Sequence, residues 1–135
     1  MKKIALILIV GLATLQYNNA QLNVENPEAK ESIEWKNKVV DLGEIPQKVP
    51  ATAVFEFTNT GEKPVLITNV KPSCGCTNPQ YPKEPIQPGQ TAQISAVYNA
   101  AALGSFNKSV TVTLNIPDGT HILRLQGKVV EPKDP

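Results

Sequence analysis

The only two cysteines of the chain, Cys74 and Cys76, lie one residue apart in the segment Ser73-Cys74-Gly75-Cys76-Thr77. Residues two apart in an extended or turn conformation have Cα atoms about 5.5–7 Å apart, which overlaps the range that a disulfide allows. Gly75 between them favours the tight backbone turn that so small a ring needs. We therefore expect an intraloop disulfide between Cys74 and Cys76 if the chain reaches an oxidising compartment.

Such a disulfide would serve one of two purposes. As a local staple it would shape the loop, although it would stabilise the fold by less than the roughly 3 kcal/mol expected for a 15-residue loop. As a reducible pair it would exchange with other thiols, because strain in so small a ring raises the reduction potential. We expect the staple, with thiol redox chemistry as the alternative.

A metal site is a third interpretation of the same cysteines. Paired thiolates suit soft ions such as copper(I) or zinc. A closed zinc site takes four ligands, whereas this chain offers Cys74, Cys76 and its single histidine, His121. His121 lies far along the sequence, so a full zinc shell would need a second molecule. No resident cofactor is expected.

Catalytic patterns are missing from the rest of the sequence. A nucleophile pair of cysteine and His121 is disfavoured, because closely spaced cysteines in an oxidising compartment are oxidised and inert. The acidic residues are scattered, with no pair typical of glycoside hydrolysis, and there is no glycine-rich phosphate loop. The sequence therefore predicts that the protein is not an enzyme.

The N-terminus has the pattern of a secretory signal peptide. Basic residues in Met1-Lys2-Lys3 precede an apolar run over residues 4–15 and a small residue, Ala20. The apolar run is shorter than the roughly 20 residues of a membrane span. We expect a signal peptide over residues 1–20 and no stable membrane insertion after its cleavage. The mature protein is predicted to be periplasmic or extracellular.

The mature chain has almost no net charge. Loss of Lys2 and Lys3 lowers the basic residues from 13 to 11 against 12 acidic ones, a net charge of −1. With Arg124 as the single arginine, this composition argues against a nucleic-acid partner, which would need a clustered basic patch.

Behind the cysteine segment, the strand pattern predicts one β-domain. Residues 51–59, 91–99, 106–114 and 121–130 alternate apolar and polar side chains with the period of a half-buried strand. Shorter strands are expected after Ser32 and over residues 65–70. Twelve prolines and turns such as Asp118-Gly119 separate the strands. About seven strands and no helical period predict an Ig-like antiparallel β-sandwich over residues 32–131. Residues 21–31 and 132–135 are expected to be a flexible N-terminus and a tail.

Three motifs together resemble a known family. They are Phe-Glu-Phe-Thr-Asn-Thr-Gly at residues 55–61, Val-Lys-Pro-Ser-Cys-Gly-Cys-Thr at residues 70–77, and Ile-Gln-Pro-Gly at residues 86–89. The chain is similar to the bacterial secreted family called domain of unknown function fifteen-seventy-three. That family is related in fold to the Ig-like modules of the abnormal-spindle and Hydin type. The resemblance implies an Ig-like fold and export but no mechanism, because the family has no established activity.

These observations predict an exported, non-catalytic interaction or scaffold module of the cell envelope. Its partner would be another envelope protein or a surface ligand. The expected contact surface is the loop over residues 72–88, formed by Ser73, Gly75, Thr77 and Tyr81 around the cysteines. Pairing of an edge strand with a partner is a further possibility, and the sequence does not indicate which edge.

Overall fold

The computed structural model describes residues 32–134, so the expected signal peptide and residues 21–31 lie outside the described part. Residues 32–134 form eight β-strands and contain no helix that could span a membrane. The strands are β1 (Ile33–Trp35), β2 (Val39–Pro46), β3 (Ala51–Asn59), β4 (Ile67–Pro72), β5 (Thr77–Gln80), β6 (Thr91–Tyr98), β7 (Gly104–Leu114) and β8 (Thr120–Val130).

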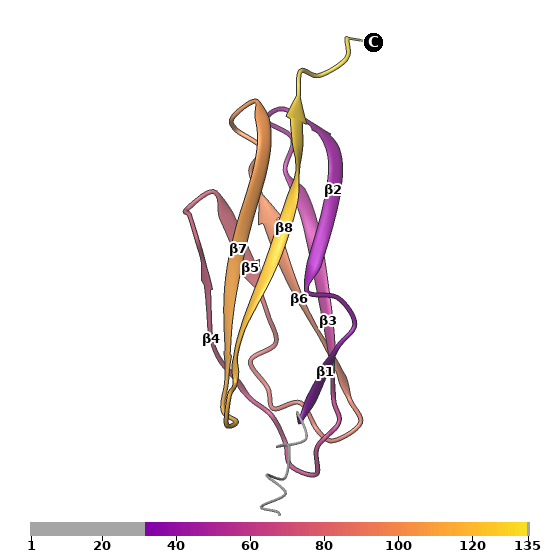
Figure 1. Ribbon diagram of the computed structural model, residues 1–135, viewed down its shortest axis with the longest axis vertical. Helices are drawn as coiled ribbons and strands as arrows, with labels where there is room; N and C mark the ends of the chain where they lie inside the picture. Colours follow the sequence, from indigo (N-terminus) through magenta and orange to yellow (C-terminus); the bar gives the residue numbers. More distant parts are fainter. Residues whose placement is uncertain (1–31, 135) are drawn as a thin grey trace, which may run out of the picture.

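The strands form two four-stranded sheets that pack face to face along the long axis of the molecule (Figure 1). One sheet has the order β1-β3-β6-β5 and the other has the order β2-β8-β7-β4. This arrangement confirms the predicted Ig-like sandwich. One expectation was wrong, because β2 and β8 pair in parallel while the other strand pairs are antiparallel. A parallel pair needs a long connection, and here residues 47–119, most of the domain, lie between the two strands.

The alternating patterns are confirmed by burial. In β3, Ala53, Phe55 and Phe57 are fully buried, while Thr52 and Val54 face solvent. Tyr98 of β6 stacks on Phe106 of β7 with ring centroids 4.3 Å apart, so the two sheets meet through aromatic as well as aliphatic side chains. The largest fully buried side chains are Phe55, Phe57, Ile33, Ile94, Leu123, Leu125, Val65, Val110, Val112, Val129 and Asn59.

Strand β5 was not expected, because its sequence lies in the proline-rich stretch that reads as a loop. It pairs with β6 from Thr77 opposite Tyr98 to Gln80 opposite Ser95, and it includes Pro79. Proline is compatible with a sheet when it lies in an edge strand, and β5 is the last strand of its sheet. The expected contact loop over residues 72–88 is therefore interrupted by a strand.

A buried amide organises the end of the sandwich opposite the cysteines. Asn59 is fully buried at the end of β3. Its side-chain amide donates to the carbonyl oxygens of Lys63 (2.8 Å) and Ile86 (2.9 Å). Its side-chain oxygen accepts from the backbone N–H of Gly61 (3.0 Å). One side chain thus joins β3, the turn that follows it and the segment that leads into β6.

Candidate functional site

The cysteine loop, residues 73–76, is the connection by which the chain passes from β4 of one sheet to β5 of the other. Cys74 and Cys76 form a disulfide, with their Cα atoms 5.3 Å apart. On the β7 side, the Ser73 N–H donates to the Ser109 carbonyl oxygen (2.8 Å), and the Ser109 N–H donates to Ser73 Oγ (3.1 Å). On the β6 side, the Asn99 N–H donates to the Cys76 carbonyl oxygen (3.0 Å). Both sheets therefore hold the ends of the disulfide ring.

Thr77 lies beneath the disulfide and is only 3% exposed. Its Oγ1 is 3.9 Å from Cys76 Sγ and 4.0 Å from Cys74 Sγ. Because a disulfide sulfur carries no hydrogen, the hydroxyl must be the donor in these contacts. The prediction of Thr77 as part of an open contact surface was wrong: the strand pairing opposite Tyr98 turns its side chain inward.

Gly75 is the exposed apex of the loop, and Ser73 beside it is also exposed. The expected need for glycine at this position is not supported. Gly75 does not have a positive φ, and a Cβ added there would meet no atom within 4 Å. The ring forms without a backbone conformation that only glycine favours.

Tyr81 lies apart from the cysteine loop, because β5 carries the chain along β6 before this residue is reached. Its ring is half-buried against the core, and Lys83 Nζ lies 3.4 Å from the ring centroid. Together with Val54 and Gln93 it lines a shallow hollow of about 310 Å³ on the face of the β1-β3-β6-β5 sheet. Tyr81 and the disulfide do not form one site.

His121 is also remote from the disulfide. It pairs with Val112 across β7 and β8, and its ring centroid is 5.7 Å from that of Trp35, whereas the cysteine loop is bonded to Ser109. Among residues 32–134, no three His, Cys, Asp or Glu side chains are grouped so that they could hold a metal ion. The structure does not assemble the proposed ligand set of Cys74, Cys76 and His121.

Two loops that the sequence analysis did not single out lie beside the cysteine loop. The Lys48 N–H donates to the Ala100 carbonyl oxygen (2.9 Å), and Gln47 Nε2 donates to the Ala101 carbonyl oxygen (3.0 Å). These bonds join residues 47–50 to residues 99–103, and Asn99 joins the second loop to Cys76. We call residues 47–50, 73–76 and 99–103 the disulfide end; these loops lie in the upper part of Figure 1.

The disulfide end has exposed apolar side chains on a constrained backbone. Val49 is 51% exposed and Leu103 is 50% exposed, with exposed Ala101 and Ala102 between the strands. Lys48 and Ala100 have φ values of 62° and 52°, although both have a side chain that disfavours this region. Ala100 is also fully buried. A sequence signal existed, since residues 100–103 read Ala-Ala-Ala-Leu where a turn normally has polar residues.

The two sheet edges next to the disulfide cannot readily accept another strand. Along β5, the backbone N–H and C=O groups of successive residues point alternately toward β6 and away from it. Because Cys76 bonds to Asn99, position 79 is one whose N–H would point away from β6, toward the open edge, and this position is Pro79. On β4, the hydrogen bond from the Ser73 N–H to Ser109 means that position 72 is likewise one whose N–H would point away from β7, and this position is Pro72. Proline lacks this donor. Pro72 and Pro79 therefore protect both edges against pairing.

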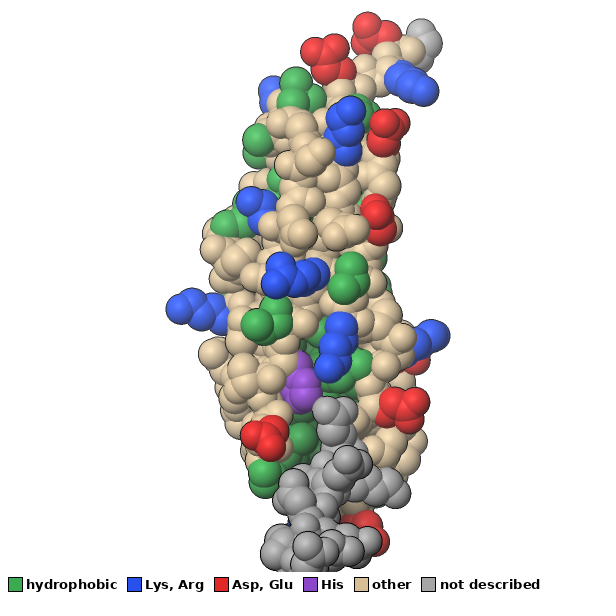
Figure 2. Space-filling view, in the orientation of Figure 1, with side chains coloured by type: hydrophobic (Ala, Val, Ile, Leu, Met, Phe, Trp, Pro, Cys, Tyr) green, Lys and Arg blue, Asp and Glu red, His purple; other side chains and the backbone are tan. Residues whose placement is uncertain are grey.

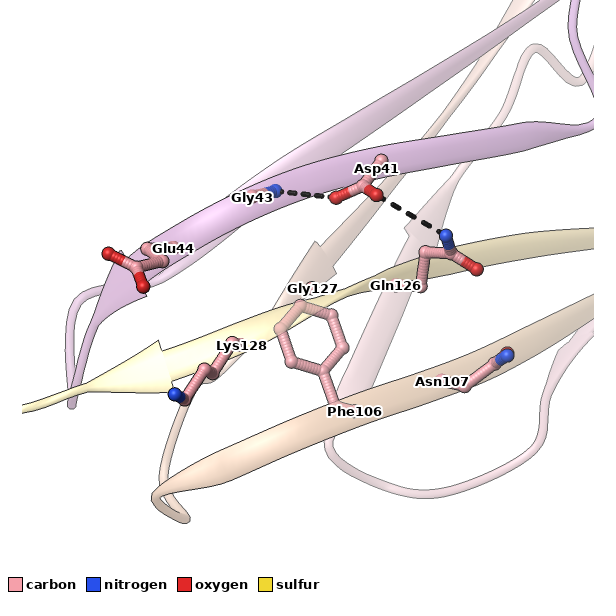
Figure 3. A pocket seen from close by; sticks show the side chains of 8 residues that line it. All are labelled: Asp41, Gly43, Glu44, Phe106, Asn107, Gln126, Gly127 and Lys128. Atoms are coloured by element: carbon pink, nitrogen blue, oxygen red, sulfur yellow. Dashed lines mark hydrogen bonds between the residues drawn. The ribbon is translucent and has the colours of Figure 1, made fainter.

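A second hollow of about 390 Å³ lies where a bulge separates part of β2 from β8 (Figure 3). The Gly43 N–H donates to Asp41 Oδ1 (2.8 Å), and Gln126 Nε2 donates to Asp41 Oδ2 (3.3 Å). These hydrogen bonds, the first more strongly, lower the pKa of Asp41 below its ordinary value of 3.8. A Cβ on Gly127 would lie 2.6 Å from the Gly43 carbonyl oxygen, so the close approach of β2 to β8 requires glycine there.

Charged side chains are spread thinly over the surface. On the face shown in Figure 2, most Lys and Arg side chains stand singly among uncharged ones and do not form a continuous basic patch. Lys36 and Glu56 form an ion pair at 3.8 Å, with the lysine side chain 74% exposed. At this exposure the pair contributes little to stability.

Comparison with solved structures shows the fold of this chain. A protein of unknown function from Porphyromonas gingivalis W83 aligns with a TM-score of 0.62 and 14% identity over 71% of this chain. This chain spans 46% of that protein, less than half of its length. The ASH/PapD-like domain 7 of human CEP192 aligns with a TM-score of 0.61 and 12% identity, over 76% of this chain and 87% of that domain.

An enzyme also contains a similar domain. The Vibrio cholerae VesB protease aligns with a TM-score of 0.62 and 14% identity over 73% of this chain, but over only 32% of the protease. At such identities the likeness concerns the fold alone. No curated protein matches the chain. The family model described as "Protein of unknown function (DUF1573)" matches residues 33–129, and this chain therefore belongs to that family.

Proposed function

We propose that the protein is exported and acts as a non-catalytic interaction or scaffold module of the cell envelope. In this proposal the disulfide end contacts another envelope protein or a surface ligand. The observation that carries the proposal is the grouping of three hydrogen-bonded loops with the exposed apolar side chains of Val49 and Leu103.

The physical argument concerns loop geometry and exposure. Sandwich domains commonly bind through loops at one end, because the sheets hold these loops in fixed relative positions. Positive φ at Lys48 and Ala100 costs free energy that the surrounding hydrogen bonds must offset. Backbone strain of this kind is concentrated at functional sites. Apolar side chains on such a constrained surface lose little conformational entropy when a partner covers them.

Export is supported by the leader pattern and by the cysteines. Disulfides persist in oxidising compartments and are rare in the cytosol. Intact mass of the protein recovered from the cell envelope or medium tests this part: a chain that begins at Gln21 and lacks two hydrogens agrees with export. A chain that retains Met1 and two free thiols would contradict it.

The contact surface is tested by crosslinking in intact cells followed by mass spectrometry. The double variant Val49→Ser/Leu103→Ser should lose the partners that the wild-type protein captures. Ile122→Ser is the matched control, because Ile122 is 53% exposed on β8, away from the disulfide end. Equal capture by the double variant and the wild type would refute the proposed surface.

A further inference from the structure

We propose that Cys74 and Cys76 form a thiol–disulfide exchange site in which the Thr77 hydroxyl stabilises the sulfur that leaves. The co-reactant is a thiol, either a small molecule or a cysteine of a partner protein. This inference is independent of the apolar contact surface, because it depends on different side chains.

The Thr77 hydroxyl is a buried donor with weak acceptors. Its two sulfur contacts, at 3.9 and 4.0 Å, are the hydrogen-bond partners found for it among the described residues. Sulfur in a disulfide accepts hydrogen bonds poorly, and a buried hydroxyl without a good partner costs free energy. A thiolate in the same place would be a charged and much stronger acceptor. Reduction therefore gives this donor the partner that it lacks in the disulfide state.

The exchange step balances with the thiol alone. The incoming thiolate attacks one sulfur of the pair and forms a mixed disulfide with it. The bond between Cys74 and Cys76 breaks, and its electron pair stays on the other sulfur, which leaves as a thiolate. Since Thr77 Oγ1 is nearly equidistant from both sulfurs, the leaving sulfur meets the same donor whichever one is attacked. A second thiolate completes the reduction by releasing the first thiol as a disulfide.

The loop is accessible and can close again. Both cysteines are half-buried, and Gly75 at the apex is exposed, with open space where a side chain would be. The hydrogen bonds of Ser73 and Cys76 to the two sheets lie outside the ring, so breaking the disulfide does not remove them. The two sulfurs would remain neighbours after reduction, which favours re-formation of the bond.

The elements that carry or flank the loop have no acidic side chain. Strands β4, β5, β6 and β7, which carry or flank the loop, contain no Asp or Glu. Their charged side chains are the cations Lys71 on β4 and Lys108 on β7, and the phenol of Tyr98 is their other titratable group in this neighbourhood. The loop itself and residues 99–103 are uncharged. A carboxylate beside the sulfurs would raise the pKa of a thiol, and these elements carry none.

The test compares wild-type protein with Thr77→Val, which has a similar shape but no hydroxyl. The equilibrium with dithiothreitol and the rate of reduction by glutathione are measured near neutral pH. We expect Thr77→Val to shift the equilibrium about tenfold toward the disulfide, the size of one hydrogen bond to a charged sulfur. Thr77→Ser, which restores the hydroxyl, should recover most of this change. Thr111→Val is the control. Thr111 is a half-buried residue of β7, and among the described residues it makes no hydrogen bond to sulfur.

A change of less than twofold in Thr77→Val, or an equal change in Thr111→Val, would overturn the proposal. A second measurement needs no variant and remains informative if Thr77→Val does not fold. In the reduced wild-type protein, the pH dependence of alkylation should give one thiol a pKa below the about 8.5 of a free cysteine. Two thiols at or above that value would equally exclude the role proposed for Thr77.

Discussion

Replacement of Asn59 by alanine should be among the most damaging single substitutions in this domain. The change removes two donated hydrogen bonds, to the carbonyls of Lys63 and Ile86, and one accepted from the Gly61 N–H. The bond to Ile86 is fully buried, so water cannot replace the lost amide there. Each bond contributes about 1 kcal/mol, and an unsatisfied buried carbonyl costs more. The free energy of unfolding should therefore fall by about 3–4 kcal/mol.

Urea denaturation followed by circular dichroism measures this loss, and thermal melting should show a decrease in Tm of roughly 15 °C for a domain of this size. Asn115→Ala is the matched control. Its side-chain oxygen accepts one hydrogen bond, from the Leu66 N–H (2.8 Å), at an exposed position, and its loss should cost about 1 kcal/mol or less. If Asn59→Ala and Asn115→Ala differ by less than about 1 kcal/mol, the assignment of Asn59 as the organising amide is refuted.

Three further outcomes follow from the same structure. Gly119→Ala should lower the free energy of unfolding, measured by urea denaturation, by about 2 kcal/mol, because the new Cβ would be forced against the Leu114 carbonyl. Gly75→Ala is the control: it adds a Cβ in open space and should leave the free energy of unfolding nearly unchanged. The pKa of the Asp41 carboxyl is lower in the folded protein than in the unfolded chain, where it is near 3.8. The ionised carboxylate therefore stabilises the fold above that pH, and this stabilisation is lost as the pH falls through the folded-state pKa. The stability difference between wild type and Asp41→Asn should accordingly narrow below about pH 4, and a constant difference would contradict this. Replacing Cys74 and Cys76 by serine should cost about 1.5 kcal/mol, since the loop that they close is very short.

The sequence was most informative where side chains alternate along a long strand. Residues 51–59 were predicted with the same bounds that β3 has, because each second side chain there enters the core. Strand β5 was missed because Pro79 argues against a strand unless the strand is known to be an edge, and edge position depends on the whole sheet. The parallel pairing of β2 with β8 was missed for a similar reason, since no local pattern reports which distant strands become neighbours.

The candidate site was predictable only in its covalent chemistry. The spacing of the two cysteines, with Gly75 between them and an oxidising compartment expected, led to the prediction of the bond between Cys74 and Cys76, which the structure contains. Nothing in the sequence distinguishes a threonine at the start of an edge strand from one in an exposed loop, so the burial of Thr77 could not be foreseen. The neighbouring loops were missed because hydrogen bonds between residues 47–50 and 99–103 depend on the tertiary fold.

The likeness to solved structures at 12–14% identity makes the sandwich itself uninformative about function. The features that give this chain its own function must therefore be side chains that the sandwich holds in place but does not need for its stability. The disulfide end and Thr77 beside it both meet that condition. Val49 and Leu103 are exposed apolar side chains that contribute little to the core, and Thr77 places a buried hydroxyl beneath the disulfide. Because the hydrogen bond from the Asn99 N–H to the Cys76 carbonyl lies outside the disulfide ring, reduction leaves the link to the loop that carries Leu103 in place, and partner capture should not depend on the oxidation state of the cysteines. Crosslinking of the wild-type protein before and after reduction should then give equal partner yields, whereas different yields would show that the two properties are connected.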